Sequence, residues 1–240
     1  MDRLCLQEQR LLRVRRRLYL RAVIFANGNL EYPLEAQAAI QPGDLVIAAD
    51  GGAHHCQTIG ISPAIVVGDL DSLNAGILEH LQASGTDIFR YPARKDYTDL
   101  ELALQLAVER GVDIILVFGA LGARWDQTLA NLLLPASAAF RGVQIRLEDG
   151  LQEIILALSN QINRLDGKPG DTVSLIPLGG DTEGITTQGL EYPLEDETLF
   201  FGSTRGISNV LLDENATVFI KKGLLLCIII HNTISNSKEV

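Results

Sequence analysis

Residues 64–72 read Ala64-Ile65-Val66-Val67-Gly68-Asp69-Leu70-Asp71-Ser72. The first four residues are apolar throughout, which is typical of a strand covered on both faces, as in a parallel sheet flanked by helices. A glycine then ends the apolar run, and two carboxylates follow one residue apart. Open α/β sheets usually bind their ligands beyond the carboxyl ends of the strands. The stretch therefore predicts an α/β fold with Asp69 and Asp71 at its ligand-binding edge.

The spacing of Asp69 and Asp71 has two interpretations. If the chain stays extended, alternate side chains point the same way, and both carboxylates can hold one Mg²⁺. Asp and Ser are also common in turns after strands, because their side chains bond to nearby backbone. Taken alone, the motif fits a turn and a metal site equally well.

Further apolar runs extend this pattern to about residue 150. The runs expected to form strands are residues 22–26, 45–49, 64–67, 87–91, 114–118 and 143–147. Between them, residues 99–110 and 126–140 are amphipathic and predict helices. We therefore expect an open, mostly parallel, Rossmann-like sheet with flanking helices, which makes residues 21–150 an α/β domain.

After residue 150, short apolar runs divided by turn residues replace this alternation, without a long helical pattern. The runs are residues 153–158, 172–177, 183–187, 199–201, 209–212, 216–220 and 224–230. Such spacing predicts a smaller all-β sandwich over residues 151–232. The boundary is expected near Asp149-Gly150, and residues 233–240 are expected to be a frayed polar tail.

Composition narrows the functional classes. The chain has 240 residues, 47% of them hydrophobic, and a formal net charge of −10. It can bury a full core, and its negative charge argues against nucleic-acid binding through a broad basic surface. Three widely spaced cysteines form no disulfide framework, and the apolar run at 224–230 is too short to cross a membrane, so we expect a cytoplasmic protein. Five arginines between positions 10 and 17 make residues 1–20 a basic N-terminal extension.

Polar clusters follow the other predicted strands of the same sheet. They are Asn27-Gly28 after the first strand, Asp50-Gly51-Gly52-Ala53 after the second, Lys95-Asp96-Tyr97-Thr98-Asp99 after the fourth, and residues 119–127 after the fifth. The second cluster opens a helical segment, whose free backbone N–H groups suit a phosphate. Taken singly, each cluster also fits an ordinary turn or helix cap.

Together the clusters place six carboxylates on one rim of the predicted sheet: Asp50, Asp69, Asp71, Asp96, Asp99 and Asp126. Carboxylates this close repel one another unless cations sit among them. Lys95 and Arg124 offset only part of that charge. The rim therefore predicts a site for a Mg²⁺-bound polyphosphate, with a basic residue on the phosphate oxygens.

Five motifs now stand in order along the chain. They are Asp50-Gly51-Gly52-Ala53, Gly68-Asp69-Leu70-Asp71-Ser72, residues 95–101, residues 119–127 and Gly206-Ile207-Ser208-Asn209. This series, spanning about residues 21–230, resembles the motifs of the thiamine pyrophosphokinase family. The resemblance implies a nucleotide-binding α/β domain followed by a thiamine-binding β-sandwich. It also implies transfer of the diphosphoryl group of ATP to thiamine, with Mg²⁺, and homodimers whose sites lie between one subunit's α/β domain and the partner's sandwich.

The resemblance also implies roles for individual residues. The metal ligands would be Asp69, Asp71 and Asp99, and the catalytic carboxylates Asp50, Asp71, Asp96 and Asp99. The residues expected at ATP are Asn27, Gly51, Gly52, Lys95, Thr98, Arg124 and Asp126. Thiamine would meet Tyr192, Ser208 and Asn209. A flat cation suits an aromatic ring, although Tyr192 fits a core or dimer-interface position equally well.

Two other functional classes stay open. One is another Mg²⁺-dependent enzyme using Asp69 and Asp71, such as a nucleotide or nucleotide-sugar transferase or a phosphatase. The other is a non-catalytic sensor of thiamine or nucleotide, against which the full set of carboxylates argues. We interpret His54 and His55 as structural or near the nucleotide, Cys56 as a small buried residue, and Trp125 as packed at its helix start.

Overall fold

The computed structural model describes residues 21–122 and 124–232. The predicted basic extension and polar tail lie outside these residues. The first half contains strands β1 (Arg21–Phe25), β2 (Leu45–Ala49), β3 (Ile65–Gly68), β4 (Asp87–Arg90), β5 (Ile114–Phe118) and β6 (Gln144–Glu148). Its helices are α2 (Pro33–Ala39), α3 (Gly52–Thr58), α4 (Ala75–Ala83), α5 (Asp99–Glu109) and α6 (Trp125–Leu133), followed by the 3₁₀ turns η1 (Leu134–Ala136) and η2 (Ala138–Phe140).

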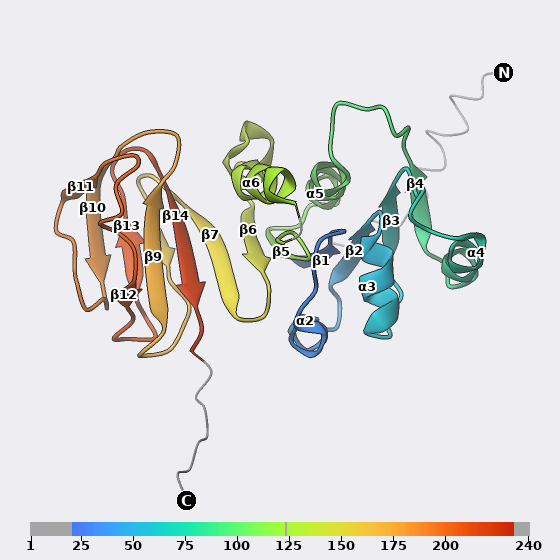
Figure 1. Ribbon diagram of the computed structural model, residues 1–240, viewed down its shortest axis with the longest axis horizontal. Helices are drawn as coiled ribbons and strands as arrows, with labels where there is room; N and C mark the ends of the chain where they lie inside the picture. Colours follow the sequence, from blue (N-terminus) through green and yellow to red (C-terminus); the bar gives the residue numbers. More distant parts are fainter. Residues whose placement is uncertain (1–20, 123, 233–240) are drawn as a thin grey trace, which may run out of the picture.

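The second half is built from strands alone. They are β7 (Gln152–Leu158), β8 (Ile162–Arg164), β9 (Thr172–Pro177), β10 (Thr182–Gln188), β11 (Glu197–Leu199), β12 (Asn209–Val210), β13 (Thr217–Phe219) and β14 (Leu224–Ile230). A four-stranded sheet in the order β11-β10-β13-β8 packs on the large sheet (Figure 1). Between them lies an aliphatic core that includes Ile155, Leu175 and Val218. The predicted β-sandwich is confirmed.

Strands β4, β3, β2, β1, β5 and β6 pair side by side in that order, and all of these pairs are parallel. Helix α5 covers one face, where Leu104 packs near Ile24 and Ile47. Helices α2, α3 and α4 cover the other face around Phe25 and Phe118. The predicted open parallel sheet is therefore confirmed. Because the strand order reverses between β1 and β5, a crevice opens at their carboxyl ends, where such sheets bind ligands.

The large sheet does not stop where the first half ends. Strand β6 forms an antiparallel hairpin with β7, and β14, β9 and β12 continue the same sheet to ten strands. The predicted boundary, Asp149-Gly150, is the hairpin turn, with Gln152 N donating to Asp149 Oδ1 at 2.8 Å. One continuous sheet thus supports both halves (Figure 1).

Some predicted elements have different bounds. The helix expected over residues 126–140 ends at Leu133, because Pro135 cannot donate an N–H, and two 3₁₀ turns follow it. The strand expected at 199–201 lies at Glu197–Leu199. Helices α2 and α4 and the short strand β8 had not been predicted. None of the helices in the described ranges is long and apolar enough to cross a bilayer.

A partly buried ionic cluster lies at the β6–β7 hairpin. The Arg146 guanidinium pairs with Glu153 Oε1 at 2.6 Å and with Asp166 Oδ2 at 2.7 Å, and Glu148 also lies close to it. Glu153 is only 8% exposed. Burial, outweighing the attraction of Arg146, raises the pKa of the Glu153 carboxyl to about 7. The single guanidinium of Arg146 therefore neutralises only part of the negative charge of several carboxylates, and the ionised form of Glu153 is disfavoured.

This raised pKa predicts a stability that falls with pH. Between about pH 4.5 and about pH 7 the folded protein keeps a proton on Glu153 that the unfolded chain releases, so unfolding becomes easier as the pH rises through this window. A shift of this size corresponds to at most roughly 3 kcal/mol. Glu153→Gln, which mimics the neutral acid, should flatten the pH profile of urea unfolding, whereas the exposed Glu79→Gln should not. Parallel profiles for Glu153→Gln and the unchanged protein would contradict this prediction.

Candidate active site

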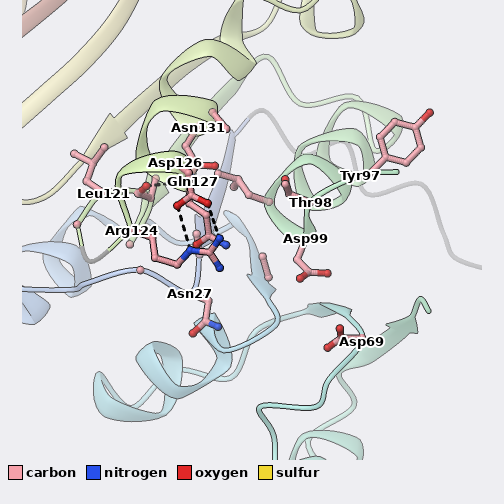
Figure 2. Close-up of a pocket in the computed structure, with 18 of the residues that line it drawn as sticks. Asn27, Asp69, Tyr97, Thr98, Asp99, Leu121, Arg124, Asp126, Gln127 and Asn131 are labelled. Carbon is pink, nitrogen blue, oxygen red and sulfur yellow. Dashed lines mark hydrogen bonds and ion pairs between the residues drawn. The ribbon is translucent and has the colours of Figure 1, made fainter. Parts of the chain in front are cut away.

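A cleft of about 620 Å³ lies at the carboxyl ends of β1 and β5. The loops after β1, β3 and β5 and the first turns of α5 and α6 form its walls (Figure 2). Its lining includes the predicted site residues Asn27, Asp69, Lys95, Thr98, Asp99, Arg124 and Asp126. The sequence therefore predicted correctly that these side chains gather at one edge of the sheet.

The loop after β1 is docked on the loop after β5. Ala26 N donates to Phe118 O at 2.8 Å, and Gly28 N donates to Gly119 O at 2.7 Å. A Cβ on Gly28 would lie 2.4 Å from that same oxygen, so only glycine allows this approach. The floor of the cleft is consequently fixed by main-chain hydrogen bonds on both sides of Asn27.

Three carboxylates converge beside the cleft, on Asp50, Asp69 and Asp71. One oxygen of each lies within 4.8 Å of the others. Asp50 is held against β3 by a 2.8 Å hydrogen bond from its N–H to Val67 O, and its φ is +46°. It is 6% exposed, and its buried Oδ1 has no hydrogen-bond partner within the described part of the chain. Because a buried carboxylate oxygen needs a partner, this donor set fits a hard cation such as Mg²⁺.

The segment from Asp69 to Asp71 is a turn and not an extended strand. Leu70 has a φ of +64° and is buried in the core on the α3 side of the sheet. Asp71 N donates to Asp69 Oδ1 at 3.2 Å, which keeps the two carboxylates together. The two interpretations of the motif therefore do not compete, because the turn itself creates the cluster. Repulsion from Asp69 is the main cause that raises the pKa of Asp71.

Asp99 lies outside this cluster of three but faces the same strand end. It is the first residue of α5, whose N-cap is Thr98, with Oγ1 accepting from Glu101 N at 3.2 Å. Lys95 Nζ lies 2.9 Å from Asp99 Oδ1, and that oxygen is 3.2 Å from the position of a Cβ on Gly68. The structure thus groups Asp50 with Asp69 and Asp71, and pairs Asp99 with Lys95.

Arg124 and Asp126 stand at the start of α6, over the cleft (Figure 2). Arg124 Nε donates to Asp126 Oδ1 at 3.1 Å, and Nη2 donates to Oδ2 at 2.5 Å. The hydrogen bond from Arg124 is the main cause that lowers the pKa of Asp126. Both side chains are about two-thirds exposed, so the guanidinium is accessible from solvent.

Other predicted residues lie away from the cleft lining. Asp96 is exposed. Gly51 and Gly52 are buried against β1, and a Cβ on Gly52 would lie 1.9 Å from Phe25 O. In the part of the chain that is described, these two glycines therefore have a packing role that the sequence did not reveal.

The three residues predicted for thiamine lie on the sandwich, and none lines the cleft of its own chain. Tyr192 is 64% exposed. Asn209 is buried, and its amide is engaged with the backbone: Oδ1 accepts from Tyr192 N at 3.0 Å, and Nδ2 donates to Tyr192 O at 2.8 Å. Ser208 is exposed, with its N–H bonded to Ser174 Oγ at 3.2 Å.

Helix α6 contributes residues to the cleft that were not predicted from the sequence. Asn131 lines the cleft, and its Nδ2 donates to Ala120 O at 2.7 Å. It follows Gln127, another lining residue, by four positions, so helical spacing was the available signal. The packing predicted for Trp125 is wrong, because its side chain is 81% exposed. Cys56 is fully buried, and His55 Nε2 lies 2.9 Å from Gly28 O, as their structural interpretation predicted.

A cleft at the switch point of a parallel sheet, rimmed by carboxylates and extended by a β-sandwich, defines a class of α/β proteins that bind their ligand beyond the strand ends. Within that class, two family models match the chain: "Thiamin pyrophosphokinase, catalytic domain" over residues 36–147, and "Thiamin pyrophosphokinase, vitamin B1 binding domain" over residues 159–225. The chain belongs to the thiamin pyrophosphokinase family. The resemblance read from its motifs is thereby confirmed.

Individual relatives agree with this family. Thiamine pyrophosphokinase of Bacillus subtilis is 33% identical over 77% of this chain and 86% of its own length. Thiamine pyrophosphokinase 1 of Arabidopsis thaliana is 28% identical over 71% of this chain and 67% of its own. The crystal structure of the Bacillus subtilis enzyme superposes with a TM-score of 0.79 at 28% identity, covering 89% of this chain and all of the other. A family member from Enterococcus faecalis gives a TM-score of 0.77, also at 28% identity, over 89% of this chain and all of its own.

Proposed function

We propose that this chain transfers the diphosphoryl group of ATP to the hydroxyl of thiamine, giving thiamine diphosphate and AMP. The hydroxyl oxygen attacks the β-phosphorus, the bond from that phosphorus to the oxygen bridging to the α-phosphate breaks, and AMP keeps the bridging oxygen. The observation that supports this function is the group Asp50, Asp69 and Asp71 beside a nucleotide-sized cleft in a chain of this family.

In this proposal the carboxylates have two roles, binding of the metal ion and acceptance of the hydroxyl proton. Asp69 and Asp71 hold Mg²⁺ together with Asp50, and Asp99 faces them from the start of α5. Bound there, the ion would neutralise oxygens of the triphosphate. The hydroxyl proton passes to a carboxylate of the rim, Asp50 or Asp96. Asp50 is the better placed, because it belongs to the carboxylate group beside the cleft, whereas Asp96 is exposed and outside that group.

ATP is held by the side chains on the cleft walls. Lys95 and Arg124 are the cations, and the planar fork of Arg124 suits two phosphate oxygens. Asp126 holds this fork over the cleft in the absence of ATP. Thr98 lies beside Lys95 at the same wall. Gly51 and Gly52 act through close packing and not through ATP contact.

Loss of the Arg124 guanidinium should weaken ATP binding. We expect Arg124→Ala to raise the KM for ATP about tenfold or more, since a charged hydrogen bond contributes about 1.5–3 kcal/mol. Arg124→Lys keeps the charge but loses the fork, and it should restore only part of the affinity. The exposed Arg141→Ala, which lines a different cavity, is the matched control. Initial rates at varied ATP measure the effect, and an unchanged KM in Arg124→Ala would exclude this contact.

We also propose a homodimer in which each cleft is completed by the sandwich of the other subunit. Two groups of exposed apolar side chains support it. Helix α6 presents Trp125, Leu129 and Leu133 at spacings of four residues, beside the cleft, and the sandwich exposes Tyr192, Phe200 and Phe201. A contiguous exposed apolar face such as that of α6 marks an interaction site. Since Tyr192 does not line the cleft of its own chain, a second subunit would bring it to thiamine.

Tyr192→Ala should then raise the KM for thiamine and leave the KM for ATP unchanged. Stacking of a cation on an aromatic ring contributes about 0.5–2 kcal/mol, so we expect a rise of roughly 2- to 30-fold. Tyr192→Trp should retain the stacking and serve as the matched variant. Equal rises in both KM values, or no rescue by Trp, would argue against a thiamine contact.

The function itself is tested by incubating the protein with ATP, Mg²⁺ and thiamine, and by separating the products by chromatography. We expect AMP and thiamine diphosphate. Parallel incubations with nucleotide sugars and with phosphomonoesters test the two enzymatic alternatives. Folded protein that binds thiamine without releasing AMP would instead support the sensor. We place the reaction in a reducing cytoplasm, since Cys56 and Cys227 are buried free thiols.

A further inference from the structure

Asn27 lies in the loop after β1, which hydrogen bonds hold on both sides of this residue. The N–H groups of Ala26 and Gly28 donate to Phe118 O, at the end of β5, and to Gly119 O, at 2.8 and 2.7 Å. Its own side chain extends toward the end of the next strand, where Nδ2 donates to Asp50 Oδ2 at 3.3 Å. One N–H of the Asn27 amide is therefore directed at a carboxylate.

Asp50 is unusual in both its backbone and its side chain. Its φ of +46° is uncommon for a residue with a Cβ and is maintained by the hydrogen bond to Val67 O. One carboxylate oxygen, Oδ2, accepts from Asn27, whereas the buried Oδ1 has no hydrogen-bond partner among residues 21–122 and 124–232. Asn27 thus orients the carboxylate through one oxygen, and the other oxygen is available to a cation.

Gly51 completes this arrangement. A Cβ at this position would lie 1.9 Å from Asn27 Oδ1 and 2.4 Å from its Cγ. The amide of Asn27 therefore occupies the space that any side chain at position 51 would need. Asn27 and Gly51 come from loops after neighbouring strands, so their fit depends on the parallel pairing of β1 with β2.

We infer that Asn27 is a positioning residue for the divalent cation: it holds the Asp50 carboxylate in place beside Asp69 and Asp71 and does not itself bind ATP. This inference rests on the cation site of the proposed function and replaces the ATP contact expected for Asn27. Hydrogen bonds would then link the end of β5, which bounds the nucleotide cleft, to the carboxylate cluster through Asn27 and Asp50. Outer partners of this kind typically contribute about 10–100-fold to metal affinity.

The test measures Mn²⁺ binding by electron paramagnetic resonance, on the full chain without ATP or thiamine. Asn27→Ala should weaken Mn²⁺ binding roughly 10- to 100-fold. Gly51→Ala should weaken it in the same direction although Asn27 is intact, because the new Cβ displaces the amide. The exposed Asn215→Ala, in a turn of the sandwich, is the matched control. Should Asn27→Ala fail to fold, Asn27→Ser takes its place.

A double-mutant cycle separates this role from a general structural one. If Asn27 acts through Asp50, Asn27→Ala combined with Asp50→Asn should bind Mn²⁺ no more weakly than Asp50→Asn alone. Additive losses would overturn the inference. So would unchanged Mn²⁺ affinity in Asn27→Ala together with a higher KM for ATP at saturating metal, because Asn27 would then contact ATP directly. Since no substrate is present in the binding measurement, failure of the transfer reaction would leave this result standing.

Discussion

Asp71→Asn is expected to reduce the rate of AMP release, at saturating ATP and thiamine, by about a thousandfold or more. A carboxylate that holds the catalytic ion supports several kcal/mol of charge stabilisation in the transition state, and about 1.4 kcal/mol corresponds to a factor of ten in rate. The fold should be retained, because Asp71 is exposed and Asn has the same shape. The change also removes the repulsion from Asp69 that raises the pKa of Asp71.

The matched control for this prediction is Asp87→Asn, at an exposed position on the edge strand β4. It removes the same charge from the same half of the chain and should leave the rate unchanged. Thermal unfolding of both variants shows whether each is folded. Retained turnover in folded Asp71→Asn would remove Asp71 from the metal site and with it the central assignment of the cluster.

Gly52→Ala is expected to destabilise the protein by about 3 kcal/mol or more, which is large for a single added methyl group. The new Cβ would lie 1.9 Å from Phe25 O and 2.6 Å from Phe25 C. Both are main-chain atoms of β1, at the centre of the parallel sheet, so they cannot move aside as a flexible side chain would. The helix α3 would have to separate from β1, and urea unfolding measures the loss.

Gly76→Ala provides the matched control for the added methyl group. Gly76 lies in the exposed first turn of α4, and a Cβ there would meet only Asn74 Oδ1, at 3.4 Å. Since Ala favours helix over Gly, this variant should be neutral or more stable by up to about 1 kcal/mol. If Gly52→Ala were as stable as Gly76→Ala, the close approach of α3 to β1 would be wrong.

Most of the α/β half of the fold could be predicted from the sequence. Strands such as β3 and β5 are apolar throughout, and polar residues follow them at the edge of the sheet where ligands bind. Local sequence patterns were therefore enough to predict the fold class and the acidic rim. The length of α6 was predicted less well, because the helical pattern continued past Pro135. Continuation of the sheet from β6 into β7 depends on pairing between halves whose patterns differ, and this pairing is not encoded locally.

Part of the cleft lining could be predicted from the polar residues that follow the strands, but the contacts among these residues could not. That Asp50 and not Asp99 joins Asp69 and Asp71 depends on the left-handed backbone of Asp50 and on its bond to Val67, which arise only when β2 and β3 pair. Likewise, Asn209 was expected at thiamine, but its amide bonds the backbone of Tyr192, seventeen positions earlier in the chain. Such contacts between distant segments leave no spacing signal in a single sequence.

In the proposed function, the acidic rim supports transfer of an intact diphosphoryl group. Phosphorus NMR during turnover of ATP with thiamine and Mg²⁺ tests it most directly, because it identifies every phosphorus atom that moves. The proposed chemistry predicts AMP and thiamine diphosphate in equal amounts from the first turnover, with no ADP. Accumulation of ADP together with thiamine monophosphate would contradict it.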